Sequence, residues 1–335
     1  MNDPQSPWVR IVVVNYNAGP MLQTCVDALA AQTMEAFETV IIDNASTQIP
    51  ISDLRLPDSR FRIRHAGANI GFAAANNLVA KDSACSWLLT LNPDASPRPN
   101  WLAKLRAATH RYPWAHMFGS TQLDSADPEI VDGFGDAFSG FGNAWRSVGG
   151  RPVTELPEGD CEVFSPCAAA ALYAKRAYDE VGGFDESFFC YLEDVDLGFR
   201  LRLRGKRCVQ VRRAEVLHTG SAVTGRMSDF SVFHTYRNRI WLLVKDIPWP
   251  LLAPVLTLHS AGTVLSLSRV QARPYRLAAL RGVWAGLKGL PRVLRNRRQV
   301  QTQRVIGSLE IARMMLWNPR TMRSRVPPLI ARKAT

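Results

Sequence analysis

Asp94 occupies a position in this sequence that suits chemistry. It follows Trp87–Leu91, five residues that predict a strand buried on both faces, and Pro93 ends that strand because proline cannot extend a sheet ladder. Ligands of open α/β sheets bind at the carboxyl edge, where a rigidly placed carboxylate can hold a divalent cation that carries a diphosphate. The alternative is an aspartate that only caps the turn after the strand.

Polar residues also follow the three earlier predicted strands, at 11–14, 39–42 and 61–65. They are Asn15 and Asn17, Asp43 and Asn44, and Asn69. A helix predicted over 21–32 makes the first two strands a strand-helix-strand unit, which is typical of a parallel sheet with right-handed crossovers. The first strand is followed by no Gly-x-Gly-x-x-Gly, and the chain has no phosphate-loop motif, so we expect a donor nucleotide at this edge rather than a dinucleotide cofactor or a cleaved triphosphate.

A second group of acids lies at Glu193, Asp194 and Asp196. We expect a helix to begin near Glu193, because acids suit a first turn, and to continue with leucines inward and Arg200, Arg202 and Arg204 outside. The acids would then either act in chemistry or only cap the helix. Farther on, short strands predicted at 207–211 and 214–217 lead to His218, and a single histidine of this kind is either packed in the core or a ligand.

The segment between the two groups of acids has little periodicity. Residues 124–160 are rich in Gly, Asp and Pro with scattered aromatic residues, which predicts a long irregular excursion after a helix at 100–110. Such a segment either shapes the acceptor side of a site or is an ordered surface insertion.

The charge of the chain is concentrated at its end. The net charge is +12 over 335 residues, yet from residue 271 onward there are 15 Lys and Arg against a single acid, Glu310, so the rest of the chain is slightly acidic. The six cysteines show neither a Cys-x-x-Cys pair nor dense spacing, and the first residues do not resemble a signal peptide. We therefore expect reduced thiols in a cytoplasmic protein.

The basic tail also carries apolar stripes. Residues 247–268 contain no charged side chain, but prolines interrupt the start and polar residues dilute the rest, so we expect an interfacial or re-entrant helix; a membrane span and a core or oligomer helix are the alternatives. The helices predicted beyond it combine Trp284 and leucines with arginines, as do helices that lie in anionic membrane surfaces.

The ordered motifs resemble those of a known family. They are Val14-Asn15-Tyr16-Asn17, Asp43-Asn44-Ala45-Ser46, Asn69-Ile70-Gly71-Phe72-Ala73, Leu91-Asn92-Pro93-Asp94, Gly182-Gly183-Phe184-Asp185, Glu193-Asp194-Val195-Asp196 and His218. Together they resemble family-2 glycosyltransferases of the GT-A fold, and most closely bacterial rhamnosyltransferases. The resemblance implies a Rossmann-like, mostly parallel sheet flanked by helices. It divides the chain into a catalytic domain at 1–240, with a nucleotide half at 1–120 and an acceptor half at 121–240, and a membrane-associating helical tail at 241–335.

The resemblance also implies roles for individual residues. Asp43 would bind the base, and the residues that enclose the rest of the nucleotide sugar would be Asn15, Asn17, Asn69, Gly71, Asn92 and Asp94. Asp94 and His218 would hold Mn²⁺ or Mg²⁺; Asn92 stands where many members have a first acid. Asp194 would be the general base of an inverting transfer, with Glu193 and Asp196 as the fallback candidates. Glu193 would bind acceptor hydroxyls and Asp196 would be structural. Arg237 would either contact the diphosphate or be an ordinary helix-surface arginine.

The function expected is therefore transfer of a sugar, with rhamnose favoured, from dTDP-rhamnose or a UDP-sugar to a glycan or lipid-linked glycan of the cell envelope. The protein would be peripheral on the inner face of the membrane and would not bind nucleic acid, and homo-oligomerisation is left open. The alternatives are a basic-tailed protein that binds nucleic acid or membranes, and a non-catalytic sugar-binding relative.

Overall fold

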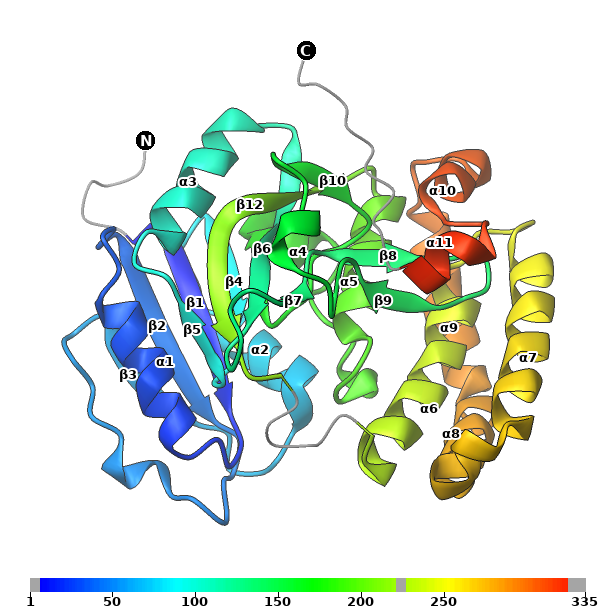
Figure 1. The fold of residues 1–335 in the computed structure, drawn as a ribbon, viewed down its shortest axis with the longest axis horizontal. Coiled ribbons are helices and arrows are strands. Elements are labelled where there is room, and N and C mark those ends of the chain that lie inside the picture. Colours follow the sequence, from blue (N-terminus) through cyan, green and yellow to red (C-terminus); the bar gives the residue numbers. More distant parts are fainter. Residues whose placement is uncertain (1–6, 221–226, 325–335) are drawn as a thin grey trace.

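Four parallel strands build the amino-terminal half of the central sheet (Figure 1). β1 (Val9–Asn15) pairs with β2 (Phe37–Asp43) on one side and β4 (Trp87–Leu91) on the other, and β3 (Phe61–His65) pairs with β2. All of β1 is buried, because helices cover both faces of the sheet, and this explains the apolar run at 11–14. The computed structural model describes residues 7–220 and 227–324.

The other half of the sheet is mixed. The strand order is β10-β12-β6-β11-β4-β1-β2-β3. The added strands are β6 (Ala115–Asp124), β10 (Cys161–Val163), β11 (Ala170–Ala174) and β12 (Arg207–His218), and the short strands β5 (Ala95–Pro97) and β7 (Val131–Gly133) pair with β12 and β6. A separate hairpin consists of β8 (Asp136–Phe138) and β9 (Ala144–Arg146). Since β11 is antiparallel to its neighbours β4 and β6, the sheet is mostly but not wholly parallel.

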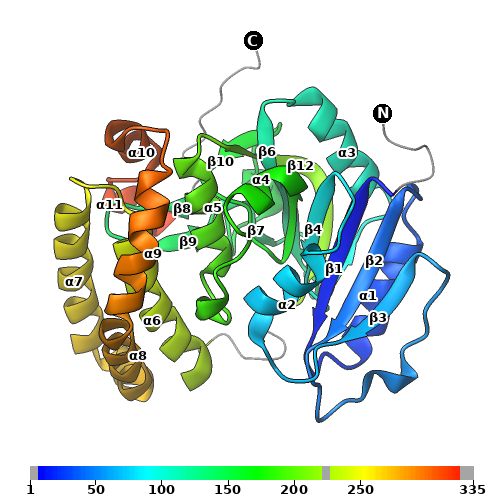
Figure 2. The ribbon, with the colours of Figure 1, turned by 180° about the vertical axis from the view of Figure 1, so that it is seen from behind.

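Helices cover the sheet in two layers. α1 (Pro20–Ala30) and α3 (Trp101–Arg111) share one apolar cluster with alternate residues of β1 (Figure 1). α2 (Gly71–Ala80), α4 (Lys175–Glu180) and α5 (Glu193–Leu203) share a second cluster on the other face (Figure 2). The expected α/β class with helices on both faces is confirmed.

Between residues 227 and 324 the structure describes six further helices, at the end of the molecule away from β3 (Figure 1). They are α6 (Asp229–Asp246), α7 (Leu252–Ser268), α8 (Arg276–Lys288), α9 (Leu290–Thr302), α10 (Ser308–Met314) and α11 (Pro319–Ser324). A third apolar cluster joins them to the body, with Phe199 of α5 packed among Leu243, Val255 and Val293. Within the described ranges, none of the helices has both the length and the apolar character needed to cross a bilayer.

The structure corrects three local predictions. Residues 207–218 form one strand, β12, with an irregularity between Val211 and Glu215, and not two. The excursion at 124–160 contains β7, β8 and β9. Arg200 and Arg202 are buried, and their guanidinium groups pair with Asp196 and Glu162 and with backbone carbonyl groups. The expectation that these two side chains lie on the exposed face of the helix is therefore wrong.

Candidate functional site

A cleft of about 410 Å³ opens at the carboxyl edge of the parallel strands. Its lining includes seven of the residues to which the resemblance gives roles, namely Asn69, Gly71, Asn92, Asp94, Glu193, Asp194 and His218. Asn15, Asn17, Asp43 and Arg237 do not line it. The fold therefore brings carboxylates that are a hundred residues apart, Asp94 and Asp194, to one cavity.

Asn15, Asn17 and Asp43 form a hydrogen-bonded group beside the cleft. The Asn15 side-chain amide donates to Asp43 Oδ1 and to Ser46 Oγ, each at 3.1 Å, and Asn15 and Asp43 are register partners on β1 and β2. Asn17, which has a left-handed backbone with φ of 54°, accepts from the backbone amides of Thr47 and Gln48. These contacts fix the 15–17 and 43–48 loops against each other.

Asn69 and Gly71 shape the start of α2. The Asn69 side-chain oxygen accepts from the Asn44 amide at 2.9 Å and from the Gly71 backbone N–H at 3.2 Å. Gly71 has φ of +83°, and a Cβ there would lie 2.5 Å from the ring of Phe189. Glycine is thus required both by the backbone conformation and by close contact with the 188–192 loop.

Asp94 and His218 lie together in the lining of the cleft. His218 Nε2 is 3.4 Å from Asp94 Oδ1 and 3.3 Å from the side-chain nitrogen of Asn92, while His218 Nδ1 is 2.7 Å from Asp132 Oδ2. The imidazole is nearly fully buried. Burial lowers the pKa of His218, but the hydrogen bonds with Asp132 and Asp94 outweigh it, so the pKa is raised above its usual value.

This arrangement fits a divalent cation. With Nδ1–H donated to Asp132, the lone pair of Nε2 faces Asp94, and a histidine ligand is commonly held in this way by a carboxylate on its other nitrogen. Two ligand atoms bound at right angles about 2.1 Å from one ion are about 3 Å apart, close to the Asp94–His218 separation. No cluster of three or more His, Cys, Asp or Glu suited to a metal occurs in the part of the chain that the structure describes. The remaining ligands would have to come from Asn92, substrate oxygens or water.

Asp194 lies in the first turn of α5, and backbone N–H groups hold its carboxylate. Ala168 N donates to Asp194 Oδ2 at 3.0 Å, and Val195 N donates to Oδ1 at 2.8 Å. Burial raises the pKa of Asp194, and these two hydrogen bonds oppose the rise. Burial, with the charge of Asp194, raises the pKa of Glu193 well above its usual value, and Glu193 Oε2 has no hydrogen-bond partner among the described residues.

The loop before Asp194 has a strained backbone. Phe189, Tyr191 and Leu192 all have positive φ, between 66° and 69°, and all three line the cleft. Asn238 of α6 donates its side-chain amide to the carbonyl groups of Phe188, Cys190 and Tyr191 at 2.7–3.0 Å. This fully buried asparagine therefore fixes a loop conformation that non-glycine residues seldom adopt.

Arg237 supports the same loop. Its guanidinium donates to the Phe188 carbonyl group at 2.8 Å and to Asn238 Oδ1 at 2.9 Å, and it lies over the Trp241 ring. Burial lowers the pKa of Arg237 to about 10. In this structure Arg237 donates to the loop and does not line the cleft, so a contact with the diphosphate stays a prediction.

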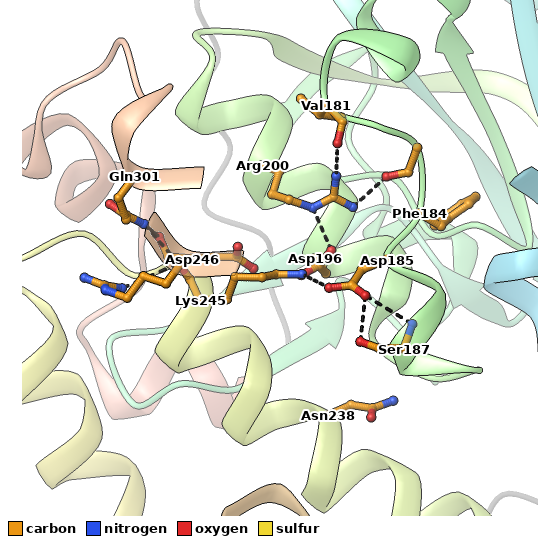
Figure 3. Close-up of polar contacts among 12 residues, drawn as sticks. Val181, Phe184, Asp185, Ser187, Asp196, Arg200, Asn238, Lys245, Asp246 and Gln301 are labelled. Atoms are coloured by element: carbon orange, nitrogen blue, oxygen red, sulfur yellow. Dashed lines mark hydrogen bonds and ion pairs between the residues drawn. The ribbon is translucent and has the colours of Figure 1, made fainter. Parts of the chain in front are cut away.

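A buried group of charges fixes α5 to α6 (Figure 3). Lys245 of α6 pairs with Asp185 at 2.6 Å and with Asp196, and Arg200 donates to Asp196 at 2.8 Å. Asp196 is fully buried and lies outside the cleft. Burial raises the pKa of Asp185, but the Lys245 ammonium outweighs burial and holds this pKa below its usual value. From α9, the Gln301 side chain donates to the carbonyl groups of Lys245 and Asp246, so three helices meet at this group.

Comparison with known proteins gives the family. The family described as "Glycosyl transferase family 2" matches residues 10–130. The N-acetylglucosaminyl-diphospho-decaprenol L-rhamnosyltransferase of Mycobacterium tuberculosis is 30% identical over 241 residues, which cover 64% of this chain and 77% of that enzyme. The chain belongs to glycosyltransferase family 2. The resemblance seen in the motifs is thereby confirmed, and the protein is a glycosyltransferase.

Solved structures show that this family-2 chain has the GT-A fold. GalNAc-T7 with UDP, GalNAc and Mn²⁺ aligns with a TM-score of 0.62 at 14% identity, covering 87% of this chain and 58% of that one. The mannosyltransferase PcManGT of Pyrobaculum calidifontis with GDP-Man and Mn²⁺ aligns with a TM-score of 0.53 at 16% identity, covering 90% and 84%. The expected fold is therefore confirmed.

The sequence did not point to four residues of this glycosyltransferase site. Asp132 on β7 holds His218, and Asp136, Trp145 and Arg146 of the β8–β9 hairpin line the cleft. Arg146 pairs with Asp132, and the Trp145 Nε1 is a buried nitrogen without a hydrogen-bond partner in the described ranges. Burial, then the charge of Asp194, raises the pKa of Asp136 well above its usual value. These residues lie in the excursion expected to be irregular, where spacing carried no signal beyond the acid and aromatic content.

Proposed function

We propose that this protein is an inverting, metal-assisted glycosyltransferase that acts in the synthesis of cell-envelope glycan. One observation carries the proposal: the Asp94–His218 pair and Asp194 line a single cleft. The donor is a nucleotide sugar, either dTDP-rhamnose or a UDP-sugar, and the acceptor is a glycan or a lipid-linked glycan. The relative from M. tuberculosis, which by its name uses rhamnose and a decaprenol-linked acceptor, supports that choice.

The proposal divides the catalytic domain, residues 1–240, at about residue 120. The first half binds the nucleotide: Asp43 accepts a hydrogen bond from the base, and Asn15, Asn17, Asn69 and Gly71 enclose the nucleoside. The fixed loops beside the cleft support this role, because their polar groups are held in place before the ligand arrives. The second half, 121–240, holds the acceptor and the base, and 241–335 is the membrane-associating part.

Asp94 and His218 hold a divalent cation, with Asn92 beside them. The cation neutralises the charge that develops on the departing diphosphate. An imidazole ligand suits Mn²⁺ better than Mg²⁺. Two glycosyltransferases of the same fold whose structures contain Mn²⁺ support a metal here as well.

Asp194 acts as the general base. Its carboxylate takes the proton of the acceptor hydroxyl while that oxygen bonds to the anomeric carbon; the bond from this carbon to the diphosphate oxygen breaks, and the nucleoside diphosphate leaves with the electron pair. One displacement inverts the anomeric centre. The raised pKa supports this role, because a more basic carboxylate accepts a proton more readily. Glu193, whose Oε2 has no partner within the described ranges, binds an acceptor hydroxyl.

The test compares two variants in donor binding and donor turnover. dTDP-rhamnose and UDP-sugars are screened by thermal shift with and without Mn²⁺, and release of the nucleoside diphosphate is then measured with the donor that binds. Asp194→Asn should keep the Mn²⁺-dependent shift and lose about 10²–10⁴-fold in turnover. Asp94→Asn should lose the Mn²⁺ dependence of binding.

Asp27→Asn on the exposed side of α1 is the matched control and should behave as the wild type. Turnover in Asp194→Asn within threefold of the wild type would exclude Asp194 as the base. A wild-type protein that binds none of these donors would favour the non-catalytic alternative, and preferential binding of duplex DNA would favour the nucleic-acid alternative.

A further inference from the structure

Large apolar side chains form a stripe along the outer face of α8. Leu277, Leu280, Trp284 and Leu287 are between 47% and 61% exposed. They recur at intervals of three and four residues and therefore lie on one side of the helix. We refer to these four residues as the α8 stripe.

The buried face of α8 is packed too closely against α6 to accept the large side chains of the stripe. Ala278, Ala279, Gly282 and Gly286 are buried against α6. A Cβ at Gly282 would lie 2.5 Å from the Phe233 carbonyl oxygen, and one at Gly286 would lie 2.8 Å from the Ile240 side chain. Rotation of α8 would force leucine and tryptophan side chains into that contact, so the stripe stays outward.

Positive charges accompany the stripe. Arg281 and Lys288 fall on the same side of α8, and the Lys288 ammonium lies 5.2 Å from the centre of the Trp284 ring. On α9 the exposed residues include Leu294 and Arg295. With 15 basic residues against one acid from residue 271 onward, the whole segment attracts an anionic partner.

α7 adds an uncharged surface to this region. Its 17 residues contain no Asp, Glu, Lys or Arg, and Val264 and Leu265 are 70% and 58% exposed. Its last turn reaches the start of α8, because Leu267 packs on the cluster formed by Val232, Ala278 and Ala279. The exposed apolar surface thus extends over two neighbouring helices.

We infer that the α8 stripe, with the outer face of α7, docks on an anionic lipid bilayer. Exposed tryptophan and leucine enter the interface between headgroups and acyl chains, and the surrounding arginine and lysine side chains pair with anionic headgroups. A second copy of the chain fits less well, because the basic helices of two copies would repel each other. Nucleic acid fits less well too, because leucines occupy the centre of the face and would meet a polar backbone.

The inference rests on the proposed function for its purpose, since a lipid-linked acceptor lies at such a surface. α6 connects the cleft to the docking face. It packs against α8, and Phe230 in its first turn lines the cleft. Phe230 is itself 41% exposed. The bilayer would therefore lie near the mouth through which the acceptor enters.

The experiment is cosedimentation of the full chain with vesicles of phosphatidylglycerol and phosphatidylcholine in equal amounts, and with vesicles of phosphatidylcholine alone. The wild type should bind the anionic vesicles, and rising salt should weaken binding. Leu280→Glu should weaken binding about tenfold, because it places a carboxylate within the stripe against anionic headgroups. Leu56→Glu makes the same change at an exposed leucine of the nucleotide half and should leave binding unchanged.

Nucleoside-diphosphate release from the donor, measured without vesicles, keeps this test separate from that of the proposed function. Leu280→Glu with normal release and a normal melting temperature, but weak vesicle binding, would support the docking face. Equal vesicle binding by the two variants, or no vesicle binding by the wild type, would overturn it. A wild-type dimer that Leu280→Glu dissociates would overturn it in favour of a second copy.

Discussion

Replacing Asn238 should release the loop that leads to Asp194, the proposed general base. Its side-chain amide has two N–H groups, which are shared among three carbonyl groups at 2.7–3.0 Å and contribute about 1 kcal/mol net each. Against this, three residues of the loop have left-handed backbones, at a cost of about 1 kcal/mol or more each. The amide thus offsets about 2 of about 3 kcal/mol, and Arg237 adds one bond to the Phe188 carbonyl group, so loss of Asn238 leaves most of the backbone cost uncompensated.

Two variants separate the loss of the hydrogen-bond donor at residue 238 from the introduction of a charge there. Asn238→Leu removes the N–H groups, and Asn238→Asp also turns a carboxylate toward the carbonyl oxygens. We expect kcat to fall about 10–100-fold in Asn238→Leu, which corresponds to about 1.4–2.7 kcal/mol of misplacement at Asp194, and further in Asn238→Asp. Amide hydrogen exchange at 188–192 should rise in both variants, while exchange in β1 and β2 should stay slow in Asn238→Leu.

Asn100→Asp is the matched control, because Asn100 is exposed at the start of α3 and is not among the residues that line the cleft. It should leave kcat and exchange unchanged. If Asn238→Leu kept kcat within twofold of the wild type and the loop exchanged no faster, the loop would hold its own conformation and the reasoning would be wrong.

Three further predictions concern the charges around the cleft. Lys245→Met leaves the buried carboxylates Asp185 and Asp196 without their ammonium partner, so urea unfolding should show a loss of about 3–5 kcal/mol, whereas Lys81→Met at an exposed site should cost under about 0.5 kcal/mol. Because burial raises the pKa of Asp194 and a base acts when deprotonated, the acid limb of the kcat/KM profile should lie above the ordinary aspartate pKa of about 3.9; a limb at or below that value would contradict the assignment. Asp132→Asn removes the carboxylate that orients His218 and should weaken Mn²⁺ binding about 10–100-fold by titration calorimetry, while an unchanged affinity would show that His218 needs no such support.

The sequence predicts the structure of residues 7–120 well because its signals there are local. Trp87–Leu91 and Phe61–His65 are strands with the bounds expected. The first is a short apolar run that ends before a proline, and in the second Phe61 and Ile63 alternate with arginines before a glycine. Parallel strands then place their polar endings at one edge. For this reason Asn69, Asn92 and Asp94 could be assigned to one cleft before any coordinates.

The structure after residue 120 depends on contacts between distant parts of the chain. Asp132 meets His218 across 86 positions, and nothing in the spacing of either residue indicates the other. Arg200 and Arg202 looked like surface residues because charge alone predicts exposure, yet each has a buried acid and backbone carbonyl groups within reach. A single sequence gives the residue types here but not the partners that change their roles.

α6 connects the loop before Asp194 to α8 and its exposed apolar stripe. One of its faces carries Asn238 and Lys245 toward the loop and helix that hold Asp194, and its other contacts include the small residues of α8, where Gly282 permits the close approach. Because α5, α6 and α9 share a buried group of charges, a shift of α6 would expose or separate carboxylates at a large cost. α6 therefore cannot move independently of Asp194. A bilayer bound at α8 would in turn hold the cleft at a fixed height above the lipid surface.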